Sequence, residues 1–73
     1  MSNEIIKSAI GQMVPMITER LKEALNIANT ANACAATGNA EAALRVLMDI
    51  EESTTEVATL FNAACILKRS LRE

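Results

Sequence analysis

The stretch ACAATGNAEAALRVL, residues 33–47, decides the fold, because Gly38 and Asn39 interrupt two runs of helix-forming residues there. A glycine in the left-handed conformation commonly follows the last turn of a helix, and asparagine is a favoured N-cap of the next one. A tight turn between two amphipathic helices produces an antiparallel helical hairpin. We therefore predict an all-α fold with one arm over about 15–37 and the other over about 40–71.

Apolar residues recur at steps of three and four in both arms, which is the spacing of residues on one helix face. In the first arm they are Ile6, Ile10, Met13, Ile17, Leu21, Ala24, Ala28, Ala31 and Ala35. In the second arm they are Ala43, Val46, Leu47, Ile50, Val57, Leu60, Phe61, Ala64, Leu67 and Leu71. Folding at the turn sets Ala35 near Ala43. Further from the turn, Leu21 is expected to lie near Val57.

Two features interrupt the helical pattern within the arms. Gly11 can end a helix and Pro15 suits the first turn of a new one, so we expect a short helix over about 3–10 and a break near 11–14. In the second arm, Ser53-Thr54-Thr55-Glu56 has the spacing of a capping box and could mark a break near residue 53. We favour one continuous helix there, because the apolar spacing keeps its phase across the segment.

Composition limits what the chain can do. Its 73 residues are expected to form a single domain over 1–73, which is too small to bury a large core although 51% of the residues are apolar. The chain has no His, and the hairpin places its two cysteines far apart, so no internal disulfide, metal site or cofactor is expected. No arrangement of residues typical of an enzyme active site is present. We therefore expect a non-enzymatic protein that gains stability from a partner chain.

Charge and hydropathy argue against two kinds of partner. The net charge is −2 and the single aromatic residue is Phe61, so nucleic acid is not an expected partner. The longest stretch without a charged residue, 24–40, contains four asparagines and is too polar to span a membrane. Free thiols, together with the lack of a secretory pattern in the first residues, predict a cytoplasmic location.

The second arm is apolar over a wider arc than one facing helix can cover, so part of it is expected to contact another chain. The methionines near the expected first break suit either the filling of a core or a surface that adapts to different partners, and both interpretations stay open. The residues predicted to bind a partner are Ile6, Ile10, Met13, Met16, Val57, Leu60, Phe61 and Leu67.

Two functions stay open at this point. The first is a chaperone or adaptor that buries its apolar helical face against a helix or groove of a different protein. The alternative is a homodimer in which two hairpins form a four-helix bundle and regulate RNA or a replication or transcription protein. Lys68, Arg69 and Arg72 would supply the basic surface that the alternative requires.

One local pattern connects the chain to a family. Residues 17–25 have the pattern Ile-Thr-x-x-Leu-x-x-Ala-Leu, the turn Gly38-Asn39-Ala40 follows, and a long apolar helix completes the chain. This layout resembles the small co-chaperones of type III secretion needle subunits. The resemblance implies a cytoplasmic helical hairpin that binds a tetratricopeptide-like chaperone, and the pair would keep a needle subunit from polymerising.

Overall fold

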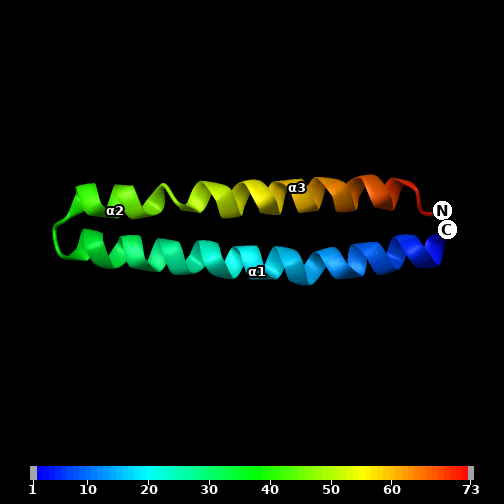
Figure 1. The fold of residues 1–73 in the computed structure, drawn as a ribbon, viewed down its shortest axis with the longest axis horizontal. Coiled ribbons are helices and arrows are strands. Elements are labelled where there is room, and N and C mark those ends of the chain that lie inside the picture. The colour runs from blue at the N-terminus through cyan, green and yellow to red at the C-terminus, as the bar shows by residue number, and fades with distance from the viewer. Residues whose placement is uncertain (1, 73) are drawn as a thin grey trace.

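The computed structural model describes residues 2–72 and shows an antiparallel helical hairpin (Figure 1). Helix α1 spans Asn3–Ala36 and forms the first arm. Helices α2, Ala40–Leu47, and α3, Ile50–Arg69, form the second arm and return beside α1. No strand occurs among these residues. The predicted all-α hairpin is therefore confirmed.

The turn forms as its sequence predicts. Gly38 has a φ of +84°, which is the left-handed conformation that glycine adopts without strain. The backbone N–H of Gly38 donates to the carbonyl of Ala35 at 3.0 Å, and that of Asn39 donates to the carbonyl of Cys34 at 3.1 Å. This pair of bonds closes the end of α1 as a Schellman motif. The Asn39 side chain then accepts the N–H of Ala42 at 3.0 Å and caps α2.

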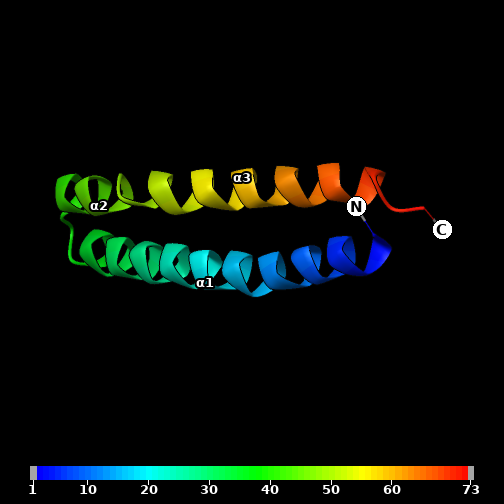
Figure 2. The same ribbon diagram turned by 45° about the vertical axis from the view of Figure 1, so that its right-hand side comes forward.

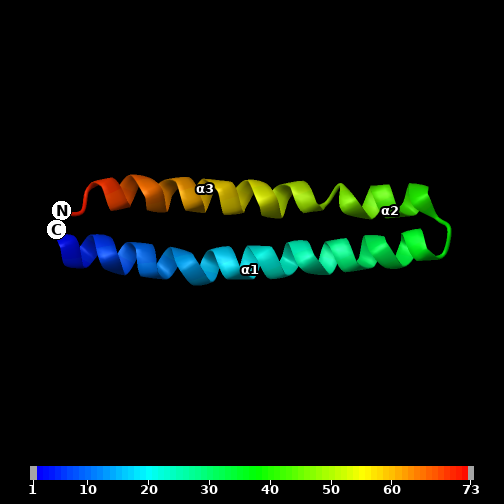
Figure 3. The ribbon, with the colours of Figure 1, turned by 180° about the vertical axis from the view of Figure 1, so that it is seen from behind.

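The expected separate helix over 3–10 is not present. Helix α1 begins after the N-cap Ser2, whose Oγ accepts the N–H of Ile5 at 3.3 Å, and it continues through Gly11 and Pro15 (Figure 3). A proline inside a helix costs about 3 kcal/mol, because it lacks an N–H and its ring crowds the preceding turn. Packing outweighs this cost here, since an unbroken helix keeps Met13 on the same line as the apolar residues before and after it.

The second arm is not the one continuous helix that we expected: it is interrupted at Met48 and Asp49, and α3 runs without a break past residue 53. The N–H of Asp49 donates to the carbonyl of Val46 at 3.1 Å, three residues back, so this turn is wound as in a 3₁₀-helix. A seven-residue repeat falls about 20° behind two full turns of an ideal α-helix. The tighter winding of the turn at Met48 and Asp49 supplies the missing rotation. The apolar residues of α3 therefore keep facing α1. The predicted end at residue 71 also shifts, because α3 ends at Arg69.

The contact between the arms follows alternate steps of three and four, as in a coiled coil. These seam positions are 6, 10, 13, 17, 20, 24, 27, 31 and 34 on the first arm, and 43, 46, 50, 53, 57, 60, 64, 67 and 71 on the second. Every one of them is buried or half-buried. Small side chains occupy the middle of the seam, where Ala24 and Ser53 are both buried.

The predicted apolar stripe of the first arm is wrong at three positions, because the seam passes through 20, 27 and 34 where Leu21, Ala28 and Ala35 were expected. Leu21 is exposed, and Arg20 occupies the seam in its place. The step of four from Met13 to Ile17 turns by about +40°, because successive residues turn by about 100°. A further step of four would reach about +80° from Met13, whereas a step of three returns to about −20° and stays nearer the centre of the seam. Leu21 therefore does not pack on Val57 as expected. The Arg20 guanidinium instead forms an ion pair with Glu56 across the seam.

Contacts at the open end set the alignment of the arms. Asn3 Nδ2 donates to the carbonyl of Arg72 at 2.8 Å, and the N–H of Arg72 donates to Asn3 Oδ1 at 3.1 Å. The first turn of α1 and the end of α3 therefore lie side by side, at the end of the hairpin opposite the loop that joins α1 and α2 (Figure 2). The seam positions then pair in order from Ile6 with Leu71 at the open end to Cys34 with Ala43 at the turn.

Candidate protein-binding face

The hairpin has an unusually large surface for its mass. It measures 54 × 15 × 14 Å and its radius of gyration is 16.9 Å, against about 11 Å for a compact domain of this length. Its accessible surface is 5459 Å², whereas a compact monomer of 7.8 kDa exposes about 4,400 Å². The chain therefore exposes roughly 1,100 Å² more than a globular protein of equal size.

Much of this surface is apolar. Among the described residues, only Ile6, Ala24 and Ala31 form a buried apolar core. Ten large apolar side chains are exposed instead: Ile5, Val14, Met16, Leu21, Leu25, Leu44, Leu47, Met48, Phe61 and Ile66. Single exposed apolar residues need no explanation, but a group of them on one face does.

Six of the ten share one side of the hairpin. Each follows directly after a seam residue, and one residue further along a helix points about 100° away from the seam. Because the arms are antiparallel, this offset points to the same side from both of them. We call this surface the apolar face, and its large side chains are Val14, Leu21, Leu25, Leu44, Leu47 and Phe61.

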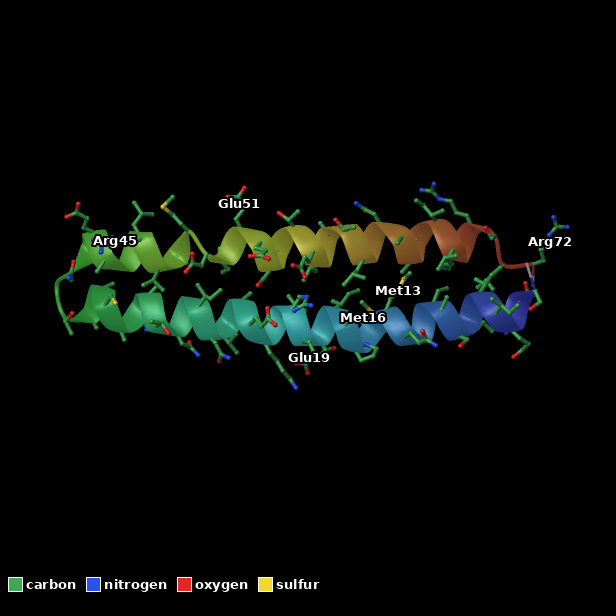
Figure 4. The ribbon with its side chains drawn as sticks, in the orientation of Figure 1. Met13, Met16, Glu19, Arg45, Glu51 and Arg72 are labelled. Carbon is green, nitrogen blue, oxygen red and sulfur yellow. The ribbon has the colours of Figure 1, made fainter. Side chains whose placement is uncertain are left out.

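Charge separates the apolar face from the opposite side. The positions directly after the seam, from 14 to 35 and from 44 to 61, carry one charged residue, Glu51. Its carboxylate points away from α1, at the outer edge of the face (Figure 4). Over the same part of the hairpin, the positions directly before the seam carry six charged residues: Glu19, Glu23, Arg45, Asp49, Glu52 and Glu56. Nearer the open end, Lys7, Lys68 and Arg72 also follow seam positions.

A shallow groove marks the apolar face near the turn. It has a volume of about 360 Å³ and is lined by Ala28, Ala31, Asn32, Ala35, Ala43, Leu44 and Leu47. Alanines form its floor, because both arms carry small residues there and their backbones can approach closely. Asn32 is the only polar residue among those lining it. The groove therefore suits an apolar side chain of another helix.

The opposite side has a polar character. Arg20 bridges the arms there, because its guanidinium pairs with Glu56 and also donates to Glu23 Oε1 at 2.8 Å. A second depression, of about 240 Å³, lies beside this cluster and includes Met16 and Leu60. Charged groups at its rim lose hydration when covered, so this side is a poorer site for a dry interface than the apolar face.

The structure divides the predicted partner-binding residues into two groups. Phe61 and Met16 are exposed, Phe61 on the apolar face and Met16 on the opposite side. The others lie in the seam between the arms: Ile6, which is fully buried, and Ile10, Met13, Val57, Leu60 and Leu67, which are half-buried. Figure 4 shows Met13 between the two arms. The predicted role of these residues in partner binding stays a prediction.

Sequence reasoning missed most of the apolar face. Val14, Leu25, Leu44 and Leu47 were not predicted to bind a partner, and Leu21 was assigned to the seam. A seven-residue repeat was the available signal, since Val14, Leu21, Ala28 and Ala35 recur at that interval. This repeat can be assigned to the apolar face only after the seam has been located. A search for apolar residues does not find the whole seam, because one of its positions is occupied by Arg20.

The described residues offer few other candidate sites. Cys34 and Cys65 are free and half-buried. Cys34 lies near the turn, and Cys65 lies in the C-terminal half of α3. No group of three or more His, Cys, Asp or Glu within residues 2–72 could hold a metal ion. None of the helices in this part of the chain is long and apolar enough to cross a membrane.

Searches against protein-family models, curated proteins and solved structures found no match to this chain.

Proposed function

We propose that this chain is a non-enzymatic protein-binding module that buries its apolar face against the helices of another polypeptide. The observation that carries the proposal is the concentration of large exposed apolar side chains on one side of the hairpin, which between residues 14 and 61 carries one charged residue where the opposite side carries six. Covering such a face removes apolar surface from water, which is the dominant favourable term in protein association. Helix packing against a groove is a common form of this recognition.

The specific role that we propose is that of a small chaperone or adaptor. The helical hairpin and its length agree with the resemblance to type III secretion co-chaperones, whereas the separate N-terminal helix predicted from Gly11 and Pro15 is absent. A hairpin with little core of its own presents a long surface to a partner, and this geometry suits a protein that shields the helices of another chain. In that role the chain would act in the cytoplasm.

The test compares two substitutions of equally exposed residues. Leu25 on the apolar face and Ile66 on the opposite side are both 60% exposed. Tagged wild-type protein, Leu25→Lys and Ile66→Lys are used to capture proteins from an extract of the source cells. We expect one set of proteins to be retained by wild type and Ile66→Lys and lost with Leu25→Lys. Equal capture by all three would contradict the proposal, provided that circular dichroism shows equal helicity.

A further inference from the structure

The apolar face has a feature that the proposed function does not use. Its largest side chain, Phe61, projects from one half of the face, and the alanine-floored groove lies in the other half. Phe61 on α3 is level with about residue 16 of α1, whereas the groove is centred near residues 31 and 32. At about 1.5 Å per residue, the Phe61 side chain and the groove lie roughly 23 Å apart along the hairpin.

A projecting group and a hollow on one face can satisfy each other in two copies of the same chain. If two hairpins stack face to face in opposite directions, a two-fold axis crosses them midway between Phe61 and the groove. Phe61 of each copy then reaches the groove of the other, and both contacts form together. Isologous contacts of this kind are the commonest arrangement in soluble homo-oligomers.

Resting on the proposed function, we infer that the partner covering the apolar face is a second copy of this chain, stacked in the opposite direction as a four-helix bundle. Stacking in the same direction would set Phe61 and Val14 of the two copies against one another. It would also leave both grooves unfilled, which close-packed interfaces avoid. Stacking in opposite directions places Phe61 of each copy over the small residues that line the groove of the other copy.

The area available agrees with a dimer. Each chain exposes roughly 1,100 Å² more than a compact monomer does, so two copies together have about 2,200 Å² of surface beyond that of two compact monomers. Stable specific interfaces bury about 1,200–2,000 Å² in total, and obligate homodimers bury more. The charge distribution is also suitable, because Glu51 lies at the outer edge of the face, where it stays in water (Figure 4).

The first test measures solution mass for the full chain by light scattering after size exclusion, over a wide range of concentrations. Wild type is expected at about twice 7.8 kDa. Phe61→Arg is compared with Ile66→Arg, because these residues are 59% and 60% exposed and lie on opposite sides. Losing one buried aromatic anchor weakens binding about 30-fold, so losing both raises the dimer Kd about 1,000-fold. Ile66→Arg should leave the mass unchanged.

The second test addresses direction, using a chain in which Cys34 and Cys65 are replaced by alanine. The two-fold axis passes close to Thr54, which follows the seam residue Ser53 and therefore lies on the apolar face. Thr54→Cys is expected to form a disulfide with its own copy on mild oxidation. Thr59→Cys lies on the opposite side of the same helix and should not.

Each possible outcome has a definite meaning. A wild-type chain that is monomeric at every concentration would overturn the second copy as partner, and the capture experiment with Leu25→Lys would still decide the proposed function. A dimer that survives Phe61→Arg would overturn the assigned interface. A dimer whose Thr54→Cys variant does not cross-link would overturn the opposite stacking direction.

Discussion

The two neighbouring isoleucines of the first helical turn give a direct test of how the hairpin is stabilised. Ile6 is 0% exposed and is the only large side chain within residues 2–72 that is fully buried, whereas Ile5 is 59% exposed. Replacing Ile6 by alanine removes three buried carbons, each worth about 0.8 kcal/mol, for a loss of about 2.4 kcal/mol. The open end of the hairpin can partly collapse into the space, which keeps the loss near the low end of the range for such changes.

The matched substitution Ile5→Ala should cost far less. Less than half of that side chain is buried, so roughly 1 kcal/mol is lost, and the higher helix propensity of alanine returns about half of it. Urea unfolding followed by circular dichroism, at one protein concentration, measures both variants. If the free energy of unfolding falls by about 1 kcal/mol for each molar of urea, the unfolding midpoints of the two variants should differ by about 2 M urea. Equal midpoints would refute the assignment of Ile6 to the seam between the arms.

Four further substitutions test the turn, a glycine within α1, the proline and the ion pair by the same assay. Gly38→Ala forces a left-handed backbone onto an L-residue and should lose about 1–2 kcal/mol, while Gly11→Ala, in open space within α1, should gain about 0.5–1 kcal/mol. Pro15→Ala should raise stability by about 1–3 kcal/mol; a loss would show that the proline is needed for the path of α1. Glu56→Gln should lose no more than about 1 kcal/mol, because Arg20 and Glu56 are both more than one-third exposed, and the loss should shrink in high salt.

Local sequence was most informative where a single residue has few conformational choices. Gly38 and Asn39 predicted the turn, because a left-handed backbone and a side-chain cap are properties of those residues alone. The same local reasoning failed at Pro15, where it predicted a break. Packing of Met13 and its neighbours along the seam decides that the helix continues, and this contact involves residues of the distant α3.

The candidate site shows a similar division. Phe61 was predicted as a partner-binding residue, since an apolar arc wider than one helix can cover must expose part of itself. Leu21 was placed in the seam incorrectly, because apolar character alone favoured leucine over the neighbouring Arg20. The angle of each residue around the helix decides the placement, and the ion pair with Glu56 makes an arginine acceptable there.

By itself, the sequence determined the helical class, the position of the turn and the antiparallel return of the second arm, because helix propensity and capping act within a few residues. The tertiary structure alone decided which residues meet between the arms. It also decided that α1 is continuous, that the second arm tightens at Met48, and that one side of the hairpin is left apolar. These features depend on the alignment of two helices over their whole length. Small differences in the rotation of successive residues around each helix add up along the arms, so no short segment of sequence determines which residues meet.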